Sequence, residues 1–600
     1  MKVTRHTLKI GNFGRGMSER SVRRALQSFP KSDWIIWVGA GVSCTGPSCL
    51  PLGVPLTEFA IDVVFGSHAR EILWRTWEHA NRIAAAPGMT QPFGPAPRLE
   101  TVLGVIETVE KCAHDCRFSF LSGFGSLEEA PYNLNHLCLA KLISDGATVI
   151  TTNFDTCIEA AFAELMGPAG QLRGKKVGNV YRFASELPNT GTLWHAHGVA
   201  HDLANLGATI RAVKLGLATE LSQELDQALS RRALLAFVGY GAGDSFDVTP
   251  FFAGKAPGLF ARSCGLFLQH GTSPTPVGAG TLLQPFGERL KLNVDTAAWL
   301  LDSSGLGTIP SSSMGDFDWR QAFLAKIDLT DYSAARPFAI CRLARELGLS
   351  YETIEATAYR QACALAERFD SWEVHRTLAF NCRMRGKSGR ERHHDLLAGD
   401  SRLLGYNYSK GNLRKAKQSA KPLDILFKES SDPTSELDWS TYTSMSSHCR
   451  PFVRKLMIKP FIRGLGPRDT EHAKKLLELA ERLGDRPLKN VTYLNQVATA
   501  MRFSLLLRAL LFGETGEEVE QKILYLYREA SSIQGYVSAY RDFAIKRILL
   551  ARLFDAREQY NEAIHYVKKS AKLAQLISDT PGRRRARYIG VLIYLHKLFR

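Results

Sequence analysis

Trp34–Ser43 (WIIWVGAGVS) is the stretch that decides the predicted fold. It opens with a run of apolar residues, and Gly39 and Gly41 follow directly. A continuous apolar run, unlike an alternating one, is typical of a strand that is buried on both faces of a sheet. Two glycines allow the backbone to turn sharply and to approach a ligand closely. The stretch therefore predicts a buried strand that ends in a glycine turn.

Similar apolar runs recur through the first half of the chain, and helical patterns lie between them. The runs are Ala147–Ile150, Leu234–Val238, Gly265–Gln269 and the weaker Leu290–Val294. Helical periodicity is visible, for example, at His136–Ile143 and Asp155–Leu165. Strands and helices that alternate in this way are typical of a doubly wound parallel sheet of the Rossmann type. Such sheets bind ligands outside the carboxyl ends of their strands, so we expect the functional residues there.

The pattern changes at Asp302–Asp316 (DSSGLGTIPSSSMGD), which is rich in serine and glycine and has no periodicity. From about Trp319 to Arg600, apolar residues recur every three or four positions, which predicts an all-α domain. We therefore place an α/β domain at residues 1–302, a linker at 303–318 and a helical domain at 319–600.

Leu550–Ala574 has the clearest repeat-like pattern in the helical half. Its small and aromatic residues fall where a tetratricopeptide-type helix pair packs: Ala551, Phe554, Tyr560, Ala563 and Ala571. Ala473–Asp485 and Thr357–Phe369 look like partial copies. The helical half thus resembles a tetratricopeptide-like array, although the irregular period leaves an irregular helical bundle as the alternative.

Charge is distributed unevenly between the two halves of the chain. Residues 1–300 carry 27 lysines and arginines against 25 aspartates and glutamates, whereas residues 301–600 carry 49 against 34. The basic excess of the helical half suits an acidic protein partner or a nucleic acid. Arg583–Arg585 with Arg587, and the cluster from Lys410 to Lys421, are its densest patches. A solvated helix surface is the alternative, because no nucleic-acid-binding motif accompanies them.

The composition excludes several classes of protein. A hydrophobic share of 45% and a charged share of 22% are typical of a folded globular chain. The apolar stretch Leu505–Phe512 is interrupted by Arg508 and is far shorter than the roughly 20 residues that span a bilayer. Met1–Met17 is polar and basic, so we expect no secretory signal. The 11 cysteines form no CxxC pair, which predicts reduced thiols in a cytoplasmic protein.

Three further motifs follow predicted strands, and each also has a simpler structural interpretation. Thr151–Asp155 (TTNFD) offers amide and carboxylate groups to a ribose, but helix capping by Asn153 or Asp155 explains it as well. His195–Gly198 (HAHG) presents an imidazole that can take a proton, but a structural histidine or a His195/His197 metal pair is the alternative. Gly239–Asp244 (GYGAGD) permits a second close backbone approach to a phosphate or ribose.

Taken in chain order, the motifs form a pattern that is much more specific than its parts. The order is GAGVS (Gly39–Ser43), LPLG (Leu50–Gly53), NLNH (Asn133–His136), TTNFD, HAHG, GYGAGD and finally LNVDT (Leu292–Thr296). This order and its approximate spacing resemble the sirtuin-like NAD-binding fold over about Trp34–Leu301. The chain looks most similar to the sirtuin-like effectors of bacterial anti-phage defence, which hydrolyse NAD.

The resemblance implies a catalytic role for two residues. Asn153 would hold the nicotinamide ribose and help to place a water molecule, and His197, directly before a glycine, would be the general base. Asp155 would support the same pocket, and His136 would pack or cap a helix. The residues implied to bind NAD⁺ follow predicted strands: Gly39, Ala40, Gly41 and Ser43 at the phosphates, Gly239, Tyr240, Gly241 and Asp244 on the adenosine side, and Asp295 and Thr296 near the adenine.

The departures from the sirtuin pattern bear on the reaction. Protein-deacylating sirtuins carry two cysteine pairs that bind zinc between the TxN strand and the HG histidine, and residues 158–194 contain no cysteine. Leu50–Gly53 stands in place of the deacylase GIPDFR motif, and Thr152 replaces the glutamine before the asparagine. The resemblance therefore implies that water, rather than acyl-lysine, accepts the ADP-ribosyl group, and that no metal is needed.

We accordingly expect an NAD⁺ glycohydrolase that acts in abortive infection and is regulated by its helical half. Its expected partners are NAD⁺, a second copy of the chain and a protein trigger or partner subunit, without a membrane. Three alternatives remain: a module that senses NAD or ADP-ribose without consuming it, a subunit of a nucleic-acid-guided defence complex, and an NAD-dependent deacylase, which the missing cysteines disfavour.

Overall fold

The computed structural model describes most of residues 28–598, together with residues 9, 10 and 26. The longer segments outside the description are 86–90, 114–118, 242–246, 270–278, 307–314, 387–389, 391–419, 433–436, 459–465 and 486–493, and shorter ones occur elsewhere. Most of the basic cluster from Lys410 to Lys421 lies outside the described residues.

The chain forms two compact units, and each is built from two separate segments. The α/β unit comprises Met1–Leu56 and Ser119–Asp328, and the helical unit comprises Thr57–Phe118 and Leu329–Arg600. This division differs from the boundaries expected from the sequence, which assigned all of residues 1–302 to the α/β domain. The physical reason is packing: helix α4 (Leu99–Cys112) contacts α13 (Tyr332–Leu347), and α3 (Ser67–Ala84) contacts α25 (Glu558–Leu576).

A nine-stranded sheet forms the centre of the α/β unit, in the spatial order β1-β9-β8-β7-β2-β3-β6-β5-β4. Strands β9, β8, β7, β2, β3 and β6 run parallel, whereas β1 and the β4–β5 hairpin are antiparallel additions at the two edges. The strands are β1 (Lys9–Ile10), β2 (Trp34–Val38), β3 (Thr148–Thr151), β4 (Arg173–Val177), β5 (Val180–Ala184), β6 (Thr192–His195), β7 (Leu234–Val238), β8 (Phe260–Gln269) and β9 (Phe286–Asn293).

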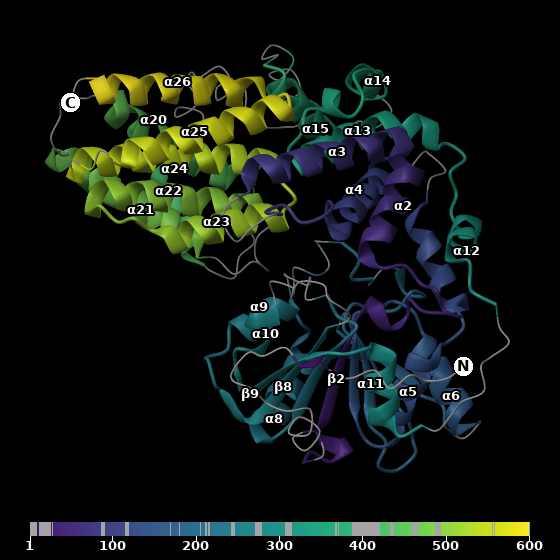
Figure 1. Cartoon of the computed structure of the whole chain (residues 1–600). Coiled ribbons are helices and arrows are strands. Elements are labelled where there is room, and N and C mark those ends of the chain that lie inside the picture. Colours follow the sequence, from purple (N-terminus) through teal and green to yellow (C-terminus); the bar gives the residue numbers. More distant parts are fainter. Residues whose placement is uncertain are drawn as a thin grey trace. The chain divides into compact units, whose positions relative to one another are not determined.

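Strand β2 alternates its side chains between two hydrophobic layers. Ile36 and Val38 face α5 (Leu134–Ser144), α6 (Cys157–Met166) and α11 (Thr296–Ser304). Ile35 and Trp37 face α8 (Thr219–Arg231), α9 (Val248–Ala253) and α10 (Ala279–Leu283), so helices cover both faces (Figure 1). Because every side chain of β2 is buried, its run is apolar throughout. The predicted fold class, a doubly wound parallel sheet followed by an all-helical region, is confirmed.

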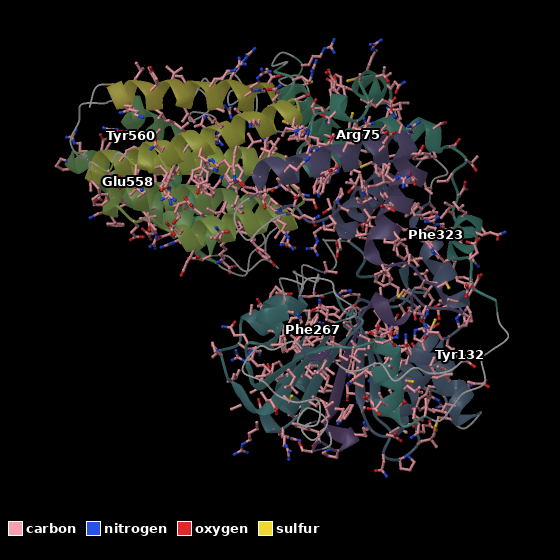
Figure 2. The ribbon with its side chains drawn as sticks, viewed as in Figure 1. Arg75, Tyr132, Phe267, Phe323, Glu558 and Tyr560 are labelled. Atoms are coloured by element: carbon pink, nitrogen blue, oxygen red, sulfur yellow. The ribbon has the colours of Figure 1, made fainter. Side chains whose placement is uncertain are left out.

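The remaining elements of the α/β unit are short. They are the 3₁₀ helices η1 (Lys31–Asp33), η2 (Ala40–Val42) and η3 (Leu121–Glu129) and the helix α12 (Trp319–Lys326). Phe323 of α12 packs against Phe120 and Phe124, which ties the end of this unit to η3. Phe267 of β8 shows how fully the sheet is covered, since it is only 1% exposed (Figure 2).

The described residues of the helical unit are mostly helical (Figure 1). Besides α3, α4, α13 and α25, it contains α2 (Gly53–Phe65, whose first turn lies in the other unit), η5 (Tyr351–Thr353), α14 (Ala358–Ala364), α15 (Trp372–Met384), α19 (Leu423–Ser431), α20 (Trp439–Ile458), α21 (Pro467–Gly484), α22 (Leu494–Phe512), α23 (Glu517–Glu529), α24 (Ile533–Phe554) and α26 (Thr580–Leu598). From α19 to α26, each helix packs on the next along the chain, which is consistent with a repeat array.

The repeat-like positions in α24 and α25 follow the sequence prediction except at one residue. Ala551, Tyr560 and Ala563 are buried, and Ala571 is half-buried. Phe554 is 62% exposed at the end of α24, so its expected packing role was wrong. No helix in the described part of the chain is both long and apolar enough to cross a lipid bilayer.

Candidate functional site

Two glycine turns meet where the strand order reverses, between β2 and β7. The Gly41 amide donates to the Gly239 carbonyl at 3.0 Å, and the Gly39 amide donates to the Val238 carbonyl at 3.2 Å. A Cβ atom on Gly41 would lie 2.8 Å from the Gly239 oxygen, and one on Gly239, whose φ is +58°, would lie 2.8 Å from the Val42 nitrogen. These glycines are therefore required by contact between two backbone turns. In this class of sheet, ligands bind in the crevice at this reversal.

Ser43, at the end of the first glycine turn, is the centre of a buried hydrogen-bond network. Its hydroxyl accepts from Asn153 Nδ2 at 3.0 Å, donates to Asp155 Oδ2 at 3.1 Å and lies 2.9 Å from His136 Nε2. All four side chains are at most 9% exposed. The structure thus brings together three residues that the sequence placed in the site, Ser43, Asn153 and Asp155. Because the Ser43 hydroxyl is fully used within the protein, it is poorly suited to act as a nucleophile.

His136 is held neutral within this network. Its Nδ1 accepts a hydrogen bond from the Asn133 amide at 3.0 Å, so in the neutral ring Nε2 carries the proton and donates to Ser43. Burial lowers its pKa to about 4, against the opposing effect of Asp155. Asn133 caps α5 and also donates to the Val42 carbonyl at 2.9 Å, which secures the glycine turn. The expected capping or packing role of His136 agrees with these contacts.

Asn153 is also fixed through its backbone. Its carbonyl accepts from His195 Nδ1 at 3.2 Å, and His195 Nε2 lies 2.8 Å from a carboxylate oxygen of Glu159 on α6. Burial lowers the pKa of His195, but the Glu159 carboxylate and the Asn153 carbonyl outweigh burial, and the pKa is raised. The side-chain oxygen of Asn153 has no hydrogen-bond partner among the described residues. Asn153 therefore offers an acceptor from a rigid position.

His197 follows β6 and forms a second network with Asp247. In the parallel pairing Thr151 lies opposite His195, so Asn153 and His197 stand two residues beyond paired positions on adjacent strands. His197 Nε2 lies 2.7 Å from Asp247 Oδ2, and both side chains are buried. The other oxygen of Asp247 accepts from the Val248 amide at 2.6 Å, at the N-terminus of α9. A carboxylate that binds one ring nitrogen orients the imidazole and stabilises its protonated form.

The two histidines of the HAHG motif thus belong to different networks. His195 is bonded to Glu159 and the Asn153 backbone, and His197 is bonded to Asp247. The strand ends at His195, so the two rings do not share one strand face, as the metal-pair alternative required. Gly198 has a φ of +80°, which provides the sharp turn expected after His197.

His136, Asp155 and Cys157 also lie close enough together to resemble a metal site. Both nitrogens of His136 have hydrogen-bond partners within the protein, as described above. The Cys157 thiol donates to the Ala130 carbonyl at 3.5 Å, and burial beside Asp155 raises its pKa well above the ordinary value. A protonated thiol is a poor metal ligand. The three side chains are better explained as part of the hydrogen-bond network around Ser43.

The residues expected near the adenosine occupy more varied positions. The Tyr240 ring is buried and stacks on Phe237 in the core, and a Cβ on Gly241 would meet no described atom. Asp244 lies outside the described residues. Asp295 caps α11 by accepting from the Ala298 amide at 2.9 Å, and Thr296 begins that helix. Ala40 lies in η2 between the two glycines and is half-buried.

Part of this unit matches a known protein family. The sequence profile of the SIR2-like domain matches residues 147–249, which span β3 to the start of α9. This segment carries Asn153, Asp155 and His197 as well as the second glycine turn. No curated protein matches the chain. The α/β unit is thus sirtuin-like over a segment that carries the His197–Asp247 pair and contributes Asn153 and Asp155 to the network around Ser43.

Sequence reasoning missed Glu159 and Asp247. Glu159 lies in the first turn of α6, and nothing in the local pattern distinguishes it from other helix carboxylates. Asp247 is separated from His197 by 50 positions in the chain, so only the fold reveals the pair. One signal was available: Asp247 precedes a short apolar segment in the position of a helix cap, which is where the structure places it.

Proposed function

We propose that the α/β unit is an NAD⁺ glycohydrolase that releases nicotinamide and ADP-ribose. The observation that carries the proposal is that Asn153 and the His197–Asp247 pair follow the carboxyl ends of two adjacent strands, β3 and β6, within the SIR2-like segment. An amide acceptor and an oriented imidazole are the groups that a glycosidic hydrolysis with a water acceptor needs. A module that only senses NAD would not need the oriented imidazole.

The reaction breaks the bond between the nicotinamide nitrogen and C1′ of the ribose. Nicotinamide leaves as a neutral ring with the bonding electron pair, and positive charge develops on the sugar as in other glycoside cleavages. The oxygen of a water molecule then bonds to C1′ and gives up a proton. Because the Asp247 carboxylate lies 2.7 Å from Nε2 and stabilises the protonated ring, we assign proton removal to the imidazole of His197.

Asn153 would orient the substrate in this scheme. Its side-chain nitrogen is held by Ser43, which directs the unpartnered oxygen toward a ribose hydroxyl or the attacking water. Fixing reactants in a productive geometry removes several kcal/mol of the barrier. The glycine turns of Gly39–Gly41 and Gly239–Gly241 would flank the phosphates, since the lack of side chains there lets a ligand approach the backbone closely.

The test is the release of free nicotinamide from NAD⁺ by the purified full chain. His197→Ala and Asn153→Ala should each lower the rate by about 100- to 10,000-fold, the usual contribution of a general base. Glu186→Ala, which removes an exposed carboxylate that pairs with Arg173, is the matched control and should keep the rate within a few fold. If both site variants keep full activity, the assignment is wrong. If NAD⁺ binds but no nicotinamide appears under any condition, the sensing alternative is correct.

We further propose that NAD⁺ depletion serves anti-phage defence and that the helical unit restrains the site until a trigger protein or self-assembly releases it. Cells that express the wild-type chain should resist phage and lose NAD⁺ on infection, and cells that express His197→Ala should do neither. A simple truncation after the α/β sequence is a poor test, because α3 and α4 would lose their packing partners in α25 and α13. Point substitutions in the helical unit avoid that problem.

A further inference from the structure

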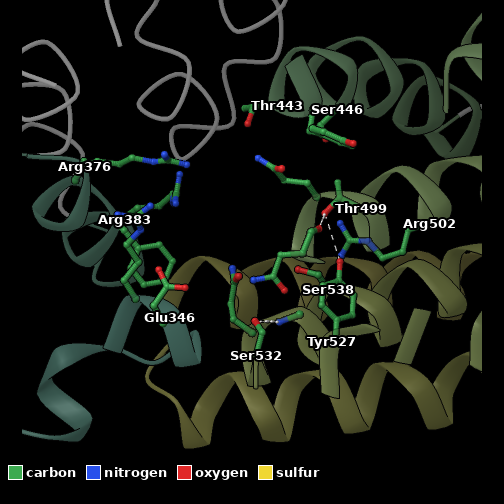
Figure 3. Close-up of a pocket in the computed structure, with 18 of the residues that line it drawn as sticks. Glu346, Arg376, Arg383, Thr443, Ser446, Thr499, Arg502, Tyr527, Ser532 and Ser538 are labelled. Carbon is green, nitrogen blue, oxygen red and sulfur yellow. Dashed lines mark hydrogen bonds between the residues drawn. The ribbon is translucent and has the colours of Figure 1, made fainter. Parts of the chain in front are cut away.

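A polar cavity of about 270 Å³ lies within the helical unit, among α13, α15, α20, α22, α24 and α26 (Figure 3). Its walls carry six arginines and a single carboxylate, that of Glu346: the arginines are Arg345, Arg376, Arg383, Arg450, Arg502 and Arg585. Arg376 and Arg383 extend from one side of the cavity and Arg502 from another (Figure 3). Six cations from five helices make a concentrated positive site.

Carboxylates that pair with these arginines neutralise only part of their positive charge. Arg345 pairs with Glu373 at 3.2 Å, and Arg502 lies 3.5 Å from Asp542, which also pairs with Arg541. Arg383 has no carboxylate within ion-pair distance among the described residues, and its guanidinium lies over the Phe380 ring. An excess of arginines over carboxylates along the cavity wall favours the binding of an anion.

The second observation is a pair of buried polar groups that lack partners. Gln496 lines the cavity and is 4% exposed, yet neither its amide nitrogen nor its amide oxygen has a hydrogen-bond partner among the described residues. Nη1 of Arg502, which is 2% exposed, also lacks one. Buried polar groups in folded proteins are nearly always hydrogen-bonded, so these groups call for a ligand that supplies acceptors and a donor.

We propose that this cavity binds a phosphate-bearing small molecule of nucleotide size. Guanidinium groups bind phosphate through paired hydrogen bonds, and side-chain amides such as Asn495 and Gln496 can pair with a base edge. The volume is near the lower limit of ordinary ligand pockets, which suits a single nucleotide and excludes a nucleic-acid duplex. The proposal is independent of NAD⁺ cleavage by the other unit.

Calorimetry on the full chain with ATP, and separately with inorganic pyrophosphate, tests the site. Arg383→Gln should weaken ATP binding by about 10- to 100-fold, which is the usual effect of losing a charged hydrogen bond. Gln496→Leu should also weaken ATP binding without lowering the melting temperature, because no hydrogen bond within the protein is lost. Added salt should weaken binding of both probes. Tighter binding of ATP than of pyrophosphate would show that the base contributes.

Two controls separate this cavity from other anion sites. Arg75→Gln removes an exposed arginine from α3, which does not line the cavity, and should leave ATP affinity unchanged (Figure 2). Asn153→Ala alters the α/β site and should also leave it unchanged. The proposal fails if neither probe binds at millimolar concentration, or if Asn153→Ala abolishes ATP binding while Arg383→Gln does not. An oligonucleotide that displaces ATP from the wild type and binds far more tightly would likewise overturn it.

Discussion

The two units use buried polar side chains in opposite ways. Around Ser43 in the α/β unit, hydroxyl, imidazole, amide and carboxylate groups bond to one another. Around the cavity of the helical unit, Gln496 and Arg502 have polar groups with no hydrogen-bond partner in the described part of the chain. Side chains that bond to one another are held in one geometry, which a reaction requires, whereas buried groups without partners gain most when a ligand supplies them. The Ser43 hydroxyl, whose hydrogen bonds lie within the protein, and the Gln496 amide, which has none among the described residues, are the two extremes of this contrast.

The largest expected effect comes from disturbing the backbone beneath the network around Ser43. Gly239→Ala places a Cβ 2.8 Å from the Val42 nitrogen at a φ of +58°, so it should destabilise the α/β unit by about 3 kcal/mol or more. Gly258→Ala is the matched control, because its φ is +72° but its Cβ would meet nothing, and it should cost about 1 kcal/mol. Thermal unfolding measures both. Equal losses would show that the contact between the turns is unimportant.

Lowering the pH should destabilise the folded protein through His136, the neutral histidine of the network around Ser43. His136 has a pKa of about 4 when folded, because it is buried, and an ordinary value of 6.5 when unfolded. Between these values the unfolded chain binds a proton that the folded chain does not, so stability present above pH 6.5 is lost as the pH falls to 4, by about 3 kcal/mol. Denaturant unfolding across this range, compared with His136→Gln, isolates the effect. An identical pH dependence in the variant would contradict it.

His195 provides an internal contrast in the same unit. Its pKa is raised in the folded state, so its contribution is complete below pH 6.5 and is lost as the pH rises through the folded value. The two windows do not overlap, so the acid loss assigned to His136 is not masked by its neighbour.

Asp247→Asn should sharpen the assignment of His197 by separating rate from binding. An asparagine keeps the shape of the side chain but cannot stabilise a protonated imidazole, so kcat for nicotinamide release should fall by about 10- to 100-fold. KM should stay within a few fold, because Asp247 acts through His197. Asp226→Asn, at a half-exposed carboxylate that pairs with Lys255, is the matched control. A rise in KM with unchanged kcat would assign Asp247 to substrate binding instead.

The smallest expected effect is the difference in folding stability between two variants that each lose a buried side-chain amide. Asn153→Leu removes a side chain that donates to Ser43 and should destabilise the protein by about 1–3 kcal/mol. Gln496→Leu removes an unpartnered amide of similar size, and stability should be unchanged or higher by about 1 kcal/mol. Chemical denaturation of each variant gives the comparison. A large loss in Gln496→Leu would show that its amide is satisfied in the folded protein.

Much of the α/β architecture was predictable because burial on both faces leaves a plain trace in the sequence. The prediction for Trp34–Val38 and for Leu234–Val238 coincides with β2 and β7 residue for residue. The sequence did not predict that residues 57–118 belong to the helical unit, because the pattern of an amphipathic helix does not indicate which helix it packs against. The long separation of β2 from β3 was the available signal, since crossovers between parallel strands are usually far shorter.

The candidate site was predictable only where glycine turns and strand ends marked it. Asn153, Asp155 and Ser43 come together because adjacent strand ends must share one edge of a parallel sheet. Glu159 and Asp247 were missed because their roles depend on distance in space rather than on spacing in the chain. The cavity of the helical unit was also missed, although one of its arginines, Arg585, belongs to the basic run noted in the sequence.

Each unit is assembled from two stretches of chain, and this has a consequence for biosynthesis. Residues 57–118 leave the ribosome long before Leu329–Arg600, which supply their packing partners. The face of α4 that packs on α13 therefore stays uncovered while about two hundred intervening residues are translated, and the face of α3 that packs on α25 stays uncovered for more than four hundred. A chaperone that shields those two helices during synthesis would raise the yield of intact protein, and slow translation of the last third would lower it.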